Sequence, residues 1–596
     1  MLRYENSVIL LRPFILFLAA LCLLGLFSTE VTDTDFWWHL KTGQYVIEHK
    51  ALPVPDPFAY TTAMQPAPPK SEAQVQHFNL THEWLAQVLM YAAYSIGGIP
   101  AVIFVRAFLL AALCGIAGWL ASRRSRDGQR SNHEFLGLLA AFASSTIAIL
   151  FASDRPALAS FLLTGVFILI LEQRRWLWSL PVLALLWANL HGGFFLGWLV
   201  LLAYVAEAWV KQQEDRKFLS LIAGAAFLLS GLNPNGFGVL STLIQYRDSA
   251  LTKTLVEWQR PYLWGQPYAF DILLYAALAV LLFSWRKVRI SDWILFAAFA
   301  AAALTAYRNI ILIGFLAPVL IAAYFPWQFF RSIKIPQSVL TYGTAVLLLL
   351  GIGTGIARGS FFQWRMASKM PAGAADYLQA HPPAGALLNT YELGGYLIWR
   401  LGEKSPANKV FIDGRALSES VFRDYQTLLY NSPSTSKQIT GDRAELLKHY
   451  NIQTVVMNTV EYVSGTLYPL ALALGNADNA DWQLVYVDAQ ALIFVNHPPN
   501  GTPVYPNKAL RVVQQMEAEC TAHIEHFPSQ PLCARTLADL WGRSGDRNHA
   551  RDLLGLYLSH AQQSDREADA AYRQLVQPPP AVPNPVPDST TPAPKQ

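Results

Sequence analysis

The chain has 596 residues, of which 53% are hydrophobic and only 14% are charged, and its formal net charge is +4 at pH 7. Soluble proteins carry about 25% charged residues, so this composition excludes an ordinary soluble protein and indicates a multi-pass α-helical membrane protein surrounded by a lipid bilayer. The small net charge says little as a sum, and we expect no nucleic-acid partner.

About eleven apolar runs are close to the length that crosses a hydrocarbon core. They are 8–28, 99–121, 134–151, 156–172, 176–190, 194–210, 218–232, 268–285, 292–306, 309–325 and 338–357. The first run resembles a signal sequence but lacks a small-residue cleavage site, and a membrane domain follows it. We therefore interpret it as a retained first helix.

The linkers between these runs alternate in character, and this alternation predicts their orientation. One set is short and basic: SRRSRDGQR, EQRRW, KQQEDRK, WRKVR and FRSIK. The other set is poorer in Lys and Arg and richer in Trp, Asp, His, Asn and Pro. The positive-inside rule places the basic set and the N-terminus in the cytoplasm and the long C-terminal region outside. Polar motifs gather in the outer linkers, which predicts one composite site in a cavity at the outer leaflet.

The first outer linker carries two acids in TDTDFWWHLKTGQYV, Asp33 and Asp35. Two carboxylates one residue apart share a metal or a proton, or one acts as a general base while the other holds a partner. A divalent cation, Mg²⁺ or Mn²⁺, is compatible with this pair, and so is a metal-free site. The alternative is that Asp35 caps the amphipathic helix predicted for FWWHLKTGQYVIEH.

The same linker also carries aromatic and polar side chains, some shortly after the two acids and others near its end. Trp37 and Trp38 are either interface anchors or stack on a sugar ring or a lipid head group. His39, followed later by His82 and Glu83 in THEWLAQ, is a candidate substrate contact. Hydrogen-bonded structural histidines are the alternative, and HEW lacks the second histidine of a zinc signature.

Three arginines in outer linkers are candidates for binding phosphate, because a planar guanidinium matches phosphate oxygens. Arg155 in SDRP either pairs with its neighbour Asp154 or binds an anion. Arg260 in EWQRP lies close to Glu257, a candidate substrate contact. Arg308 in AYRN interrupts a nearly unbroken apolar run and otherwise snorkels to the interface. We predict that at least one of the three binds phosphate.

The motif WANLHGGF places Asn189 and His191 at a break between two apolar runs. The paired glycines permit a tight turn and a close approach of backbone or ligand. The break is either a simple helical hairpin or a part of the outer cavity to which His191 points.

The composition divides the chain into four regions. We predict a transmembrane domain at 1–357 with its first outer loop at 29–98, an outer α/β domain at 358–500, a tetratricopeptide-like helical appendage at 501–575, and a disordered proline-rich tail at 576–596. A single copy of the helical repeat cannot form a solenoid. The low charge and high proline content of the tail favour disorder.

Alternating elements predict the α/β domain. We expect helices in AADYLQAH and AELLKHYN, strands in GALLNTY, NKVFIDGRA and IQTVVMNT, and a hairpin in WQLVYVDAQALIFV. Asp413 and Arg415 in FIDGR form either a salt bridge that holds their loop, which we favour, or a ligand site after a strand. Cys520 and Cys533 pair if this region lies in an oxidising compartment.

Several motifs together resemble a group of bacterial multi-pass proteins related to the GT-C glycosyltransferases, which include dolichyl-phosphate-mannose protein mannosyltransferase-like enzymes and aminoarabinose transferases. The motifs are DTDFWWHLKTG, PVPDPFAYT, HEWLAQ, SDRP, WANLHGGF, NPNG, EWQRP, ELGGYLIW and VFIDGR, and the similarity covers about 8–500. The resemblance implies a GT-C-like fold in the bacterial inner membrane, an active site facing the periplasm, and a sugar donor linked to polyprenyl phosphate.

The resemblance further implies an inverting transfer and an essential acid in the first outer loop, which maps to Asp33 or Asp35. Family members place their acids in different local patterns, so the choice between the two stays open. The chemistry fits independently, because a carboxylate deprotonates an acceptor hydroxyl while a cation neutralises the leaving phosphate. The acceptor is a periplasmic glycan, lipid or protein.

The rival hypothesis is a non-enzymatic carrier or flippase for a lipid-linked glycan, or an envelope assembly scaffold. Transporters usually show internal repeats and broken helices near the bilayer midplane. The sequence shows no such duplication, and its polar groups fall at one face of the membrane. These features favour the enzyme.

Overall fold

The computed structural model describes residues 2–64, 70–126, 133–248, 256–265, 267–326, 336–383, 385–403, 405, 408–415, 417–430, 442–561 and 564–577. The chain divides into two compact units. The first comprises Met1–Leu428 and Glu445–Val456, and the second comprises Leu429–Ala444 and Met457–Gln596. The proline-rich tail predicted at 576–596 lies almost entirely outside the described residues.

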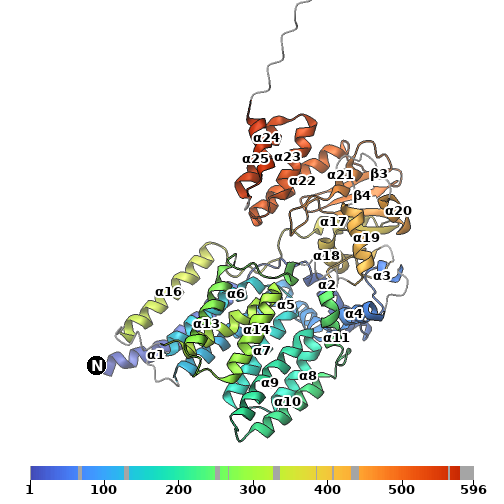
Figure 1. Cartoon of the computed structure of the whole chain (residues 1–596). Helices are drawn as coiled ribbons and strands as arrows, with labels where there is room; N and C mark the ends of the chain where they lie inside the picture. Colours follow the sequence, from blue (N-terminus) through green and yellow to red (C-terminus); the bar gives the residue numbers. More distant parts are fainter. Residues whose placement is uncertain are drawn as a thin grey trace, which may run out of the picture. The chain divides into compact units, whose positions relative to one another are not determined.

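Long apolar helices make up most of the first unit (Figure 1). They are α1 (Leu2–Phe27), α5 (Trp84–Arg126), α6 (His133–Ala148), α7 (Ala157–Gln173), α8 (Ser179–Leu190), α9 (Phe195–Val210), α10 (Arg216–Ser230), α13 (Tyr268–Phe283), α14 (Ile290–Thr305), α15 (Ile310–Tyr324) and α16 (Gln337–Ala357). Each predicted run thus falls on a helix, within a few residues at most ends. The exception is the second run, which is one part of the longer α5.

Five stretches of the described residues are long and apolar enough to cross a membrane. They are Glu72–Ser125, His133–Phe151, Gly192–Val210, Tyr307–Tyr324 and Gln337–Ala357. The structure confirms the helical, membrane-type character of the unit. That all eleven helices cross a bilayer stays a prediction.

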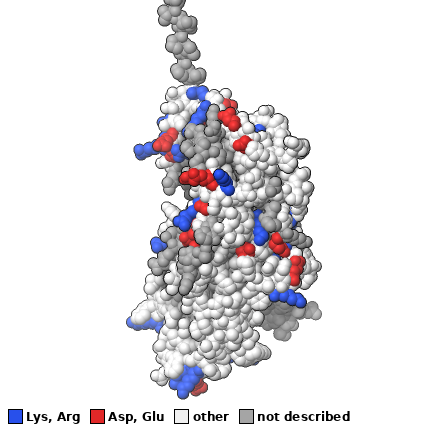
Figure 2. Space-filling view, turned by 90° about the vertical axis from the view of Figure 1, so that its right-hand side faces the viewer, with Lys and Arg blue, Asp and Glu red and all other residues white. Residues whose placement is uncertain are grey.

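The helix α15 lies in the centre of the bundle. It packs against α5, α6, α13 and α14, and most of its side chains are buried. A helix that is hydrophobic all round needs such surroundings, because it has no polar face to turn outward. On the face in Figure 2, the bundle surface carries few charged side chains along its length.

Short helices lie beside the bundle in the long connections. They are α2 (Phe36–His49), α3 (Thr61–Met64), α4 (Lys70–Thr81), α11 (Val239–Asp248) and the 3₁₀ turns η1 (Ile149–Phe151), η2 (Gly192–Phe194), η3 (Val256–Trp258) and η4 (Tyr307–Asn309). The helix α2 is the amphipathic helix predicted from the sequence. It packs against α5 on one side and against α18 (Tyr391–Leu401) on the other.

The first unit also contains a small α/β segment that follows the bundle helices in sequence. Its elements are α17 (Ala372–Ala380), β1 (Ala386–Asn389), α18, α19 (Glu419–Tyr430), α20 (Asp442–His449) and β2 (Ile452–Met457). The strands β1 and β2 pair in parallel. The predicted helices in AADYLQAH and AELLKHYN and the strands in GALLNTY and IQTVVMNT are confirmed.

The strand predicted for NKVFIDGRA is wrong. Within it, only Val410 forms a β-bridge, with Ala59 of the first loop. The chain then leaves the extended path because the Asn389 side chain bonds the backbone of Phe411 and Ile412, at 2.9 and 2.8 Å. A run of β-favouring residues is therefore held as a loop by tertiary hydrogen bonds.

The second unit contains α21 (Pro469–Gly475), the hairpin β3 (Trp482–Val487) and β4 (Leu492–Asn496), and the helices α22 (Lys508–His526), α23 (Leu532–Ser544), α24 (Arg547–His560) and α25 (Arg566–Val576). The predicted antiparallel hairpin is confirmed. Consecutive helices from α22 to α25 pack on one another, and a disulfide joins Cys520 of α22 to Cys533 of α23. The predicted domain boundaries at 357, 500 and 575 stay predictions.

Candidate active site

Polar residues from several connections meet at one end of the bundle. The segment after α1 carries Asp33 and Asp35, the turn before α7 carries Arg155, η3 carries Glu257 and η4 carries Arg308. Consecutive helices run in opposite directions, so alternate connections reach the same end. These five residues are called the acid site below.

Arg155 is the centre of the acid site. Its Nε lies 2.5 Å from Asp33 Oδ2 and its Nη2 lies 3.1 Å from Asp33 Oδ1, which is a bidentate pair. The same Nη2 lies 2.9 Å from Asp35 Oδ2, and Nη1 lies 3.1 Å from Glu257 Oε2. Three carboxylates from two connections therefore share one guanidinium.

Arg308 extends the acid site on the side of Glu257. Its Nη1 lies 3.5 Å from Glu257 Oε1, and its guanidinium lies over the Trp258 ring, 4.6 Å from the ring centre. About a third of the side chain of each arginine, Arg155 and Arg308, stays exposed. The site thus offers partly free cationic groups next to its acids.

The two aspartates differ in protonation. Burial disfavours the charged form of Asp33, but the Arg155 charge and its hydrogen bonds outweigh burial and lower the pKa of Asp33. Burial raises the pKa of Asp35 to about 6, because Arg155 is shared and the Asp33 charge lies nearby. Asp33 is therefore a fixed anion, whereas Asp35 takes up and releases a proton close to neutral pH.

Asp35 does not cap α2 with its side chain. It occupies the N-cap position, but its carboxylate accepts no hydrogen bond from the first turn of the helix. The carboxylate is turned toward Arg155 instead, and Asp33 Oδ1 accepts the backbone N–H of Asp35 at 3.0 Å. The capping alternative is thus wrong for the side chain.

Arg155 does not pair with its neighbour Asp154 either. Asp154 Oδ2 lies 2.7 Å from Nη1 of Arg106, and both side chains are almost fully buried. Arg106 also donates to the backbone carbonyl of Thr29, directly before the acid site. Sequence analysis missed Arg106, although its charge in the apolar run AVIFVRAFLL was a signal, because intramembrane charges need partners.

A second cluster lies beside the acid site and is called the histidine cluster below. Three histidines surround the buried carboxylate of Glu83. Its Oε1 lies 3.2 Å from His82 Nε2 and 3.5 Å from His191 Nε2, and its Oε2 lies 3.5 Å from His39 Nδ1. The Gln87 amide, which sequence analysis missed, lies 3.2 Å from His39 Nδ1.

His82 links Glu83 to the helix turn before it. Its Nδ1 donates a hydrogen bond to the backbone carbonyl oxygen of Phe78 at 2.7 Å, because a carbonyl oxygen can only accept. Its Nε2 lies 3.2 Å from the Glu83 carboxylate. The ring of His82 is therefore fixed between these two oxygens.

His191 is held as a neutral ring. Its Nδ1 accepts the N–H of Gly193 at 3.0 Å and the hydroxyl of Ser160 at 2.7 Å, which leaves the proton on Nε2, toward Glu83. The indole of Trp187 donates to Ser160 Oγ at 2.7 Å. Burial lowers the pKa of His191 to about 3. Burial also lowers the pKa of His39, to about 4.

The two tryptophans of the first loop are packed inside the unit. Trp37 is buried, donates from Nε1 to the sulfur of Met370 at 3.2 Å, and meets the Tyr396 ring edge-on. Trp38 is also buried, and its ring lies against His39 with 3.5 Å between ring centres. Their contact with a substrate stays a prediction.

Two more predicted residues lie outside both clusters. Asn189 accepts the indole N–H of Trp84 at 2.9 Å and donates to the carbonyls of Leu185 and Leu232, so it joins three helix ends. Arg260 is exposed and makes no contact with the acid site in the described part of the chain.

The loop of FIDGR contains a buried ion-pair cluster, as favoured from the sequence. Arg415 donates to both oxygens of Asp413, at 2.7 Å each, and to both oxygens of Asp56 in the first loop, at 2.6 and 3.2 Å. All three side chains are almost inaccessible to solvent. The cluster therefore locks the loop of Asp413 onto the first loop.

Among the described residues, one group of three metal-ligating side chains has its ligand atoms within 4.8 Å of one another. It comprises Glu48, His49 and Glu403, at the end of α2 remote from Asp35. Two of the three are exposed, and Glu403 already contacts Lys41 Nζ at 3.0 Å. This group is an ordinary solvated cluster.

No family model and no curated protein matches the chain. Among solved structures, it is similar to the archaeal oligosaccharyltransferase AglB from Archaeoglobus fulgidus, in complex with an inhibitory peptide and a dolichol-phosphate. The TM-score is 0.51 at 13% sequence identity, over 82% of this chain and 75% of that chain. At this identity the likeness concerns the fold, and it confirms the GT-C-type resemblance at that level.

Proposed function

We propose that the protein is a membrane glycosyltransferase that moves a sugar from a polyprenyl-phosphate donor to an acceptor at the end of the bundle that carries the acid site. The observation that carries this proposal is the convergence of Asp33, Asp35 and Glu257 on Arg155, with Arg308 alongside. The site provides a base and partly free cations, which are the two groups the reaction needs.

Each residue of the acid site has a distinct role in this proposal. Asp35 is the general base for the acceptor hydroxyl, because burial raises its pKa to about 6, near the pH of operation. Asp33 stays ionised and fixes the Arg155 guanidinium through its bidentate pair. Arg155 and Arg308 turn their exposed edges toward the leaving phosphate and stabilise its charge.

The oxygen donors of the acid site also fit a divalent cation such as Mg²⁺ or Mn²⁺. Three carboxylates against the two guanidiniums of Arg155 and Arg308 leave an excess of negative charge, and hard cations prefer carboxylate oxygens. If an ion binds, Asp35 and Glu257 would hold it in place of the role of Asp35 as base, because both oxygens of Asp33 are already paired with Arg155. When bound, it would neutralise charge on the leaving phosphate.

For the location, we propose the bacterial inner membrane with the acid site facing the periplasm. Among the described residues, the basic linkers EQRRW, KQQEDRK and WRKVR fall at the other end of the helices, which supports this orientation through the positive-inside rule. The disulfide of Cys520 and Cys533 in the second unit supports an oxidising compartment for the C-terminal region. The acceptor is then a periplasmic glycan, lipid or protein.

The test is a transfer assay with purified protein, a synthetic polyprenyl-phosphate sugar, and membrane extracts as the source of acceptor. We expect Asp35→Asn to abolish turnover and Asp33→Asn to leave a small residual rate. Both variants should unfold at nearly the same temperature as the wild type in detergent.

Two outcomes would count against the enzyme. Full activity in both variants would remove the catalytic assignment. Tight donor binding without any donor turnover, in the wild type and with every acceptor fraction, would favour the rival carrier or scaffold. Exchange of Arg260→Ala serves as the matched control, because this arginine lies outside the acid site.

A further inference from the structure

The loop of FIDGR packs directly on the Asp35 carboxylate. Gly414 lies so close that a Cβ atom built on it would be 1.8 Å from Asp35 Oδ1, 2.7 Å from Cγ and 3.2 Å from Oδ2. All three of its nearest neighbours belong to Asp35. A backbone segment more than 370 residues away in the sequence therefore forms one wall of the acid site.

The same region meets the first loop at a second glycine. A Cβ atom on Gly395, in ELGGYLIW, would lie 2.4 Å from the backbone oxygen of Thr34, between the two aspartates. The neighbouring Gly394 lies equally close to the backbone oxygen of Ile412, in the loop of Gly414. The glycines of both motifs thus serve close packing around Asp35.

The loop of Gly414 is held too firmly to withdraw from Asp35. On one side Arg415 pairs with Asp413 and Asp56 in a buried cluster. On the other side lies Asn389, which is fully buried. Its side-chain amide accepts the backbone N–H of Phe411 and donates to the backbone carbonyl of Ile412. Breaking a buried ion pair leaves an unpaired charge in the protein interior, so the loop resists displacement.

Arg155 Nη2 lies 2.9 Å from Oδ2 of the Asp35 carboxylate. Its Oδ1 faces Gly414. The carboxylate is therefore confined between a guanidinium on one side and an immobile backbone on the other. A single methyl group, added as the Cβ of residue 414, would change the surface that the loop presents to the carboxylate.

We propose that Gly414 is a positioning residue of the acid site, and that the loop held by Asp56, Asp413 and Arg415 sets the place of the Asp35 carboxylate. The catalytic part of this inference, an effect of Gly414 on the rate of transfer, rests on the proposed function. Its structural part, the close contact between Gly414 and Asp35, stands without it.

The test of the structural part is a double-mutant cycle of thermal stability in detergent. The backbone of Gly414 is not in the left-handed region, so alanine is strained there by crowding alone. We expect Gly414→Ala to lower the unfolding temperature in the wild-type background. In the Asp35→Ala background the same change should have little effect, because the atoms that the methyl group meets are gone. Equal losses in both backgrounds would overturn the inference, whatever the protein's activity.

The test of the functional part is the separation of kcat from KM in the transfer reaction. Displacement of a reacting group by about 1 Å costs about 100-fold in rate, so we expect Gly414→Ala to lower kcat by about this factor with little change in KM for the donor. A variant that folds and keeps the wild-type kcat would overturn the functional part.

Two glycine variants serve as controls. Gly475→Ala in α21 of the second unit crowds Val512 Cγ2 at 2.7 Å, so it should lower the unfolding temperature without lowering kcat of the folded protein. Gly224→Ala in α10 meets nothing within 4 Å and should change neither. If the Asp35→Asn variant is inactive and the Gly414→Ala variant is fully active, this inference alone is wrong. If the Asp35→Asn variant is active, the proposed function is wrong.

Discussion

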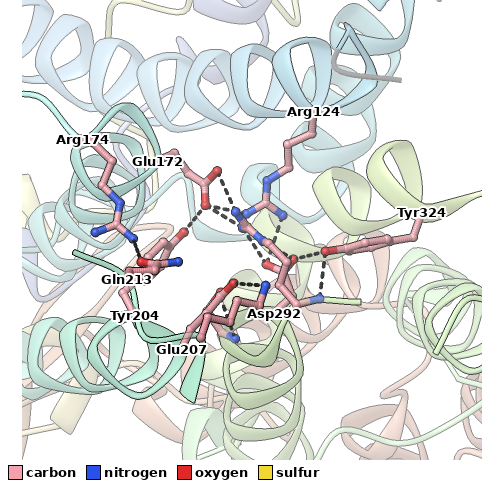
Figure 3. A network of polar contacts seen from close by, with 11 residues as sticks. Arg124, Glu172, Arg174, Tyr204, Glu207, Gln213, Asp292 and Tyr324 are labelled. Atoms are coloured by element: carbon pink, nitrogen blue, oxygen red, sulfur yellow. Dashed lines mark hydrogen bonds and ion pairs between the residues drawn. The ribbon is translucent and has the colours of Figure 1, made fainter. Parts of the chain in front are cut away.

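Both ends of the helical bundle carry a cluster of acids and arginines, but the two clusters differ in charge balance and in how fully their acids are paired. At the end that begins α7, three carboxylates share Arg155, and the side chains of Arg155 and Glu257 are 33% and 39% exposed. At the other end of α7, Glu172 and Asp292 lie beside Arg124 (Figure 3), and both acids also pair with Arg289. The side chains of Glu172 and Asp292 are 8% and 0% exposed, whereas Glu257 at the first end is 39% exposed.

The second group, Arg124, Glu172, Arg289 and Asp292, is called the closed network. Its two guanidiniums balance its two carboxylates, and every carboxylate oxygen accepts at least one hydrogen bond. The hydroxyls of Tyr204 and Tyr324 complete the shell of acceptor bonds. The network joins α5, α7, α9, α14 and α15, and both of its carboxylates are fully hydrogen-bonded.

This difference teaches how to separate a structural cluster from a functional one. Charge balance with fully hydrogen-bonded acids identifies a structural cluster, whereas an excess of acids with an exposed member such as Glu257 identifies a site that awaits a ligand. The helix α7, with 17 residues, connects the two and is about 25 Å long. Mutations at its two ends should therefore separate activity from stability.

Among the cations of the two ends, the largest effect on activity is expected for Arg155→Ala. It leaves Asp33, Asp35 and Glu257 without their shared cation, which removes the stabilisation of the leaving phosphate. Loss of one such group costs about 10²–10³-fold in kcat, and the freed acids add to it by repelling one another. The measurement is the rate of transfer per folded molecule, and Arg155→Lys should restore only a part of it because a lysine cannot bridge three carboxylates.

The opposite result is expected for Arg124→Ala in the closed network. Removal of one partner leaves the buried acids Glu172 and Asp292 with Arg289 alone, and such losses cost about 3–5 kcal/mol of stability. Thermal unfolding in detergent should shift strongly, while kcat of the surviving folded protein stays near the wild type. An Arg124→Ala protein that is stable but inactive would erase the distinction between the two ends.

The pH dependence of transfer gives a third, smaller effect. Because the pKa of Asp35 is raised to about 6, the base is ionised and active above this value and is protonated and inactive below it. The kcat should fall about tenfold per pH unit below 6. In the Asp33→Asn variant, the fall of the residual kcat on the acidic side should occur at lower pH, because the neighbouring negative charge that raises the pKa of Asp35 is gone. A fall that stays at the same pH would assign it to another group.

Sequence analysis anticipates the bundle because its signal is local. A run of apolar residues between basic and polar linkers needs no knowledge of its neighbours, and each predicted run lies on a helix. The gathering of Asp33, Arg155 and Arg308 at one end followed from the alternation of the linkers. The identity of their partners did not, because a pairing depends on how the connections fold back over the bundle.

Two errors show where the local signal fails. Asp154 and Arg155 are neighbours in sequence, but they point to different partners, Arg106 and Asp33, because one side chain is buried among helices and the other faces the site. The strand expected in NKVFIDGRA is a loop because Asn389 bonds its backbone. Neither contact leaves a trace in a single sequence beyond an unexplained charge or a buried amide.

The smallest effect is expected for Arg260→Ala, which sharpens the boundary of the acid site. Arg260 was a phosphate candidate on sequence alone, only three residues from Glu257, yet it is exposed and has no contact with the acid site among the described residues. Its removal should change kcat and donor KM by less than about twofold, since exposed charges are screened by salt. Removal of Arg308, which contacts Glu257 at 3.5 Å, should instead raise donor KM, and the difference should persist at high salt. Equal losses for both arginines would mean that the donor phosphate reaches beyond the acid site to the exposed arginine, and the cationic surface would then have to be extended to include it.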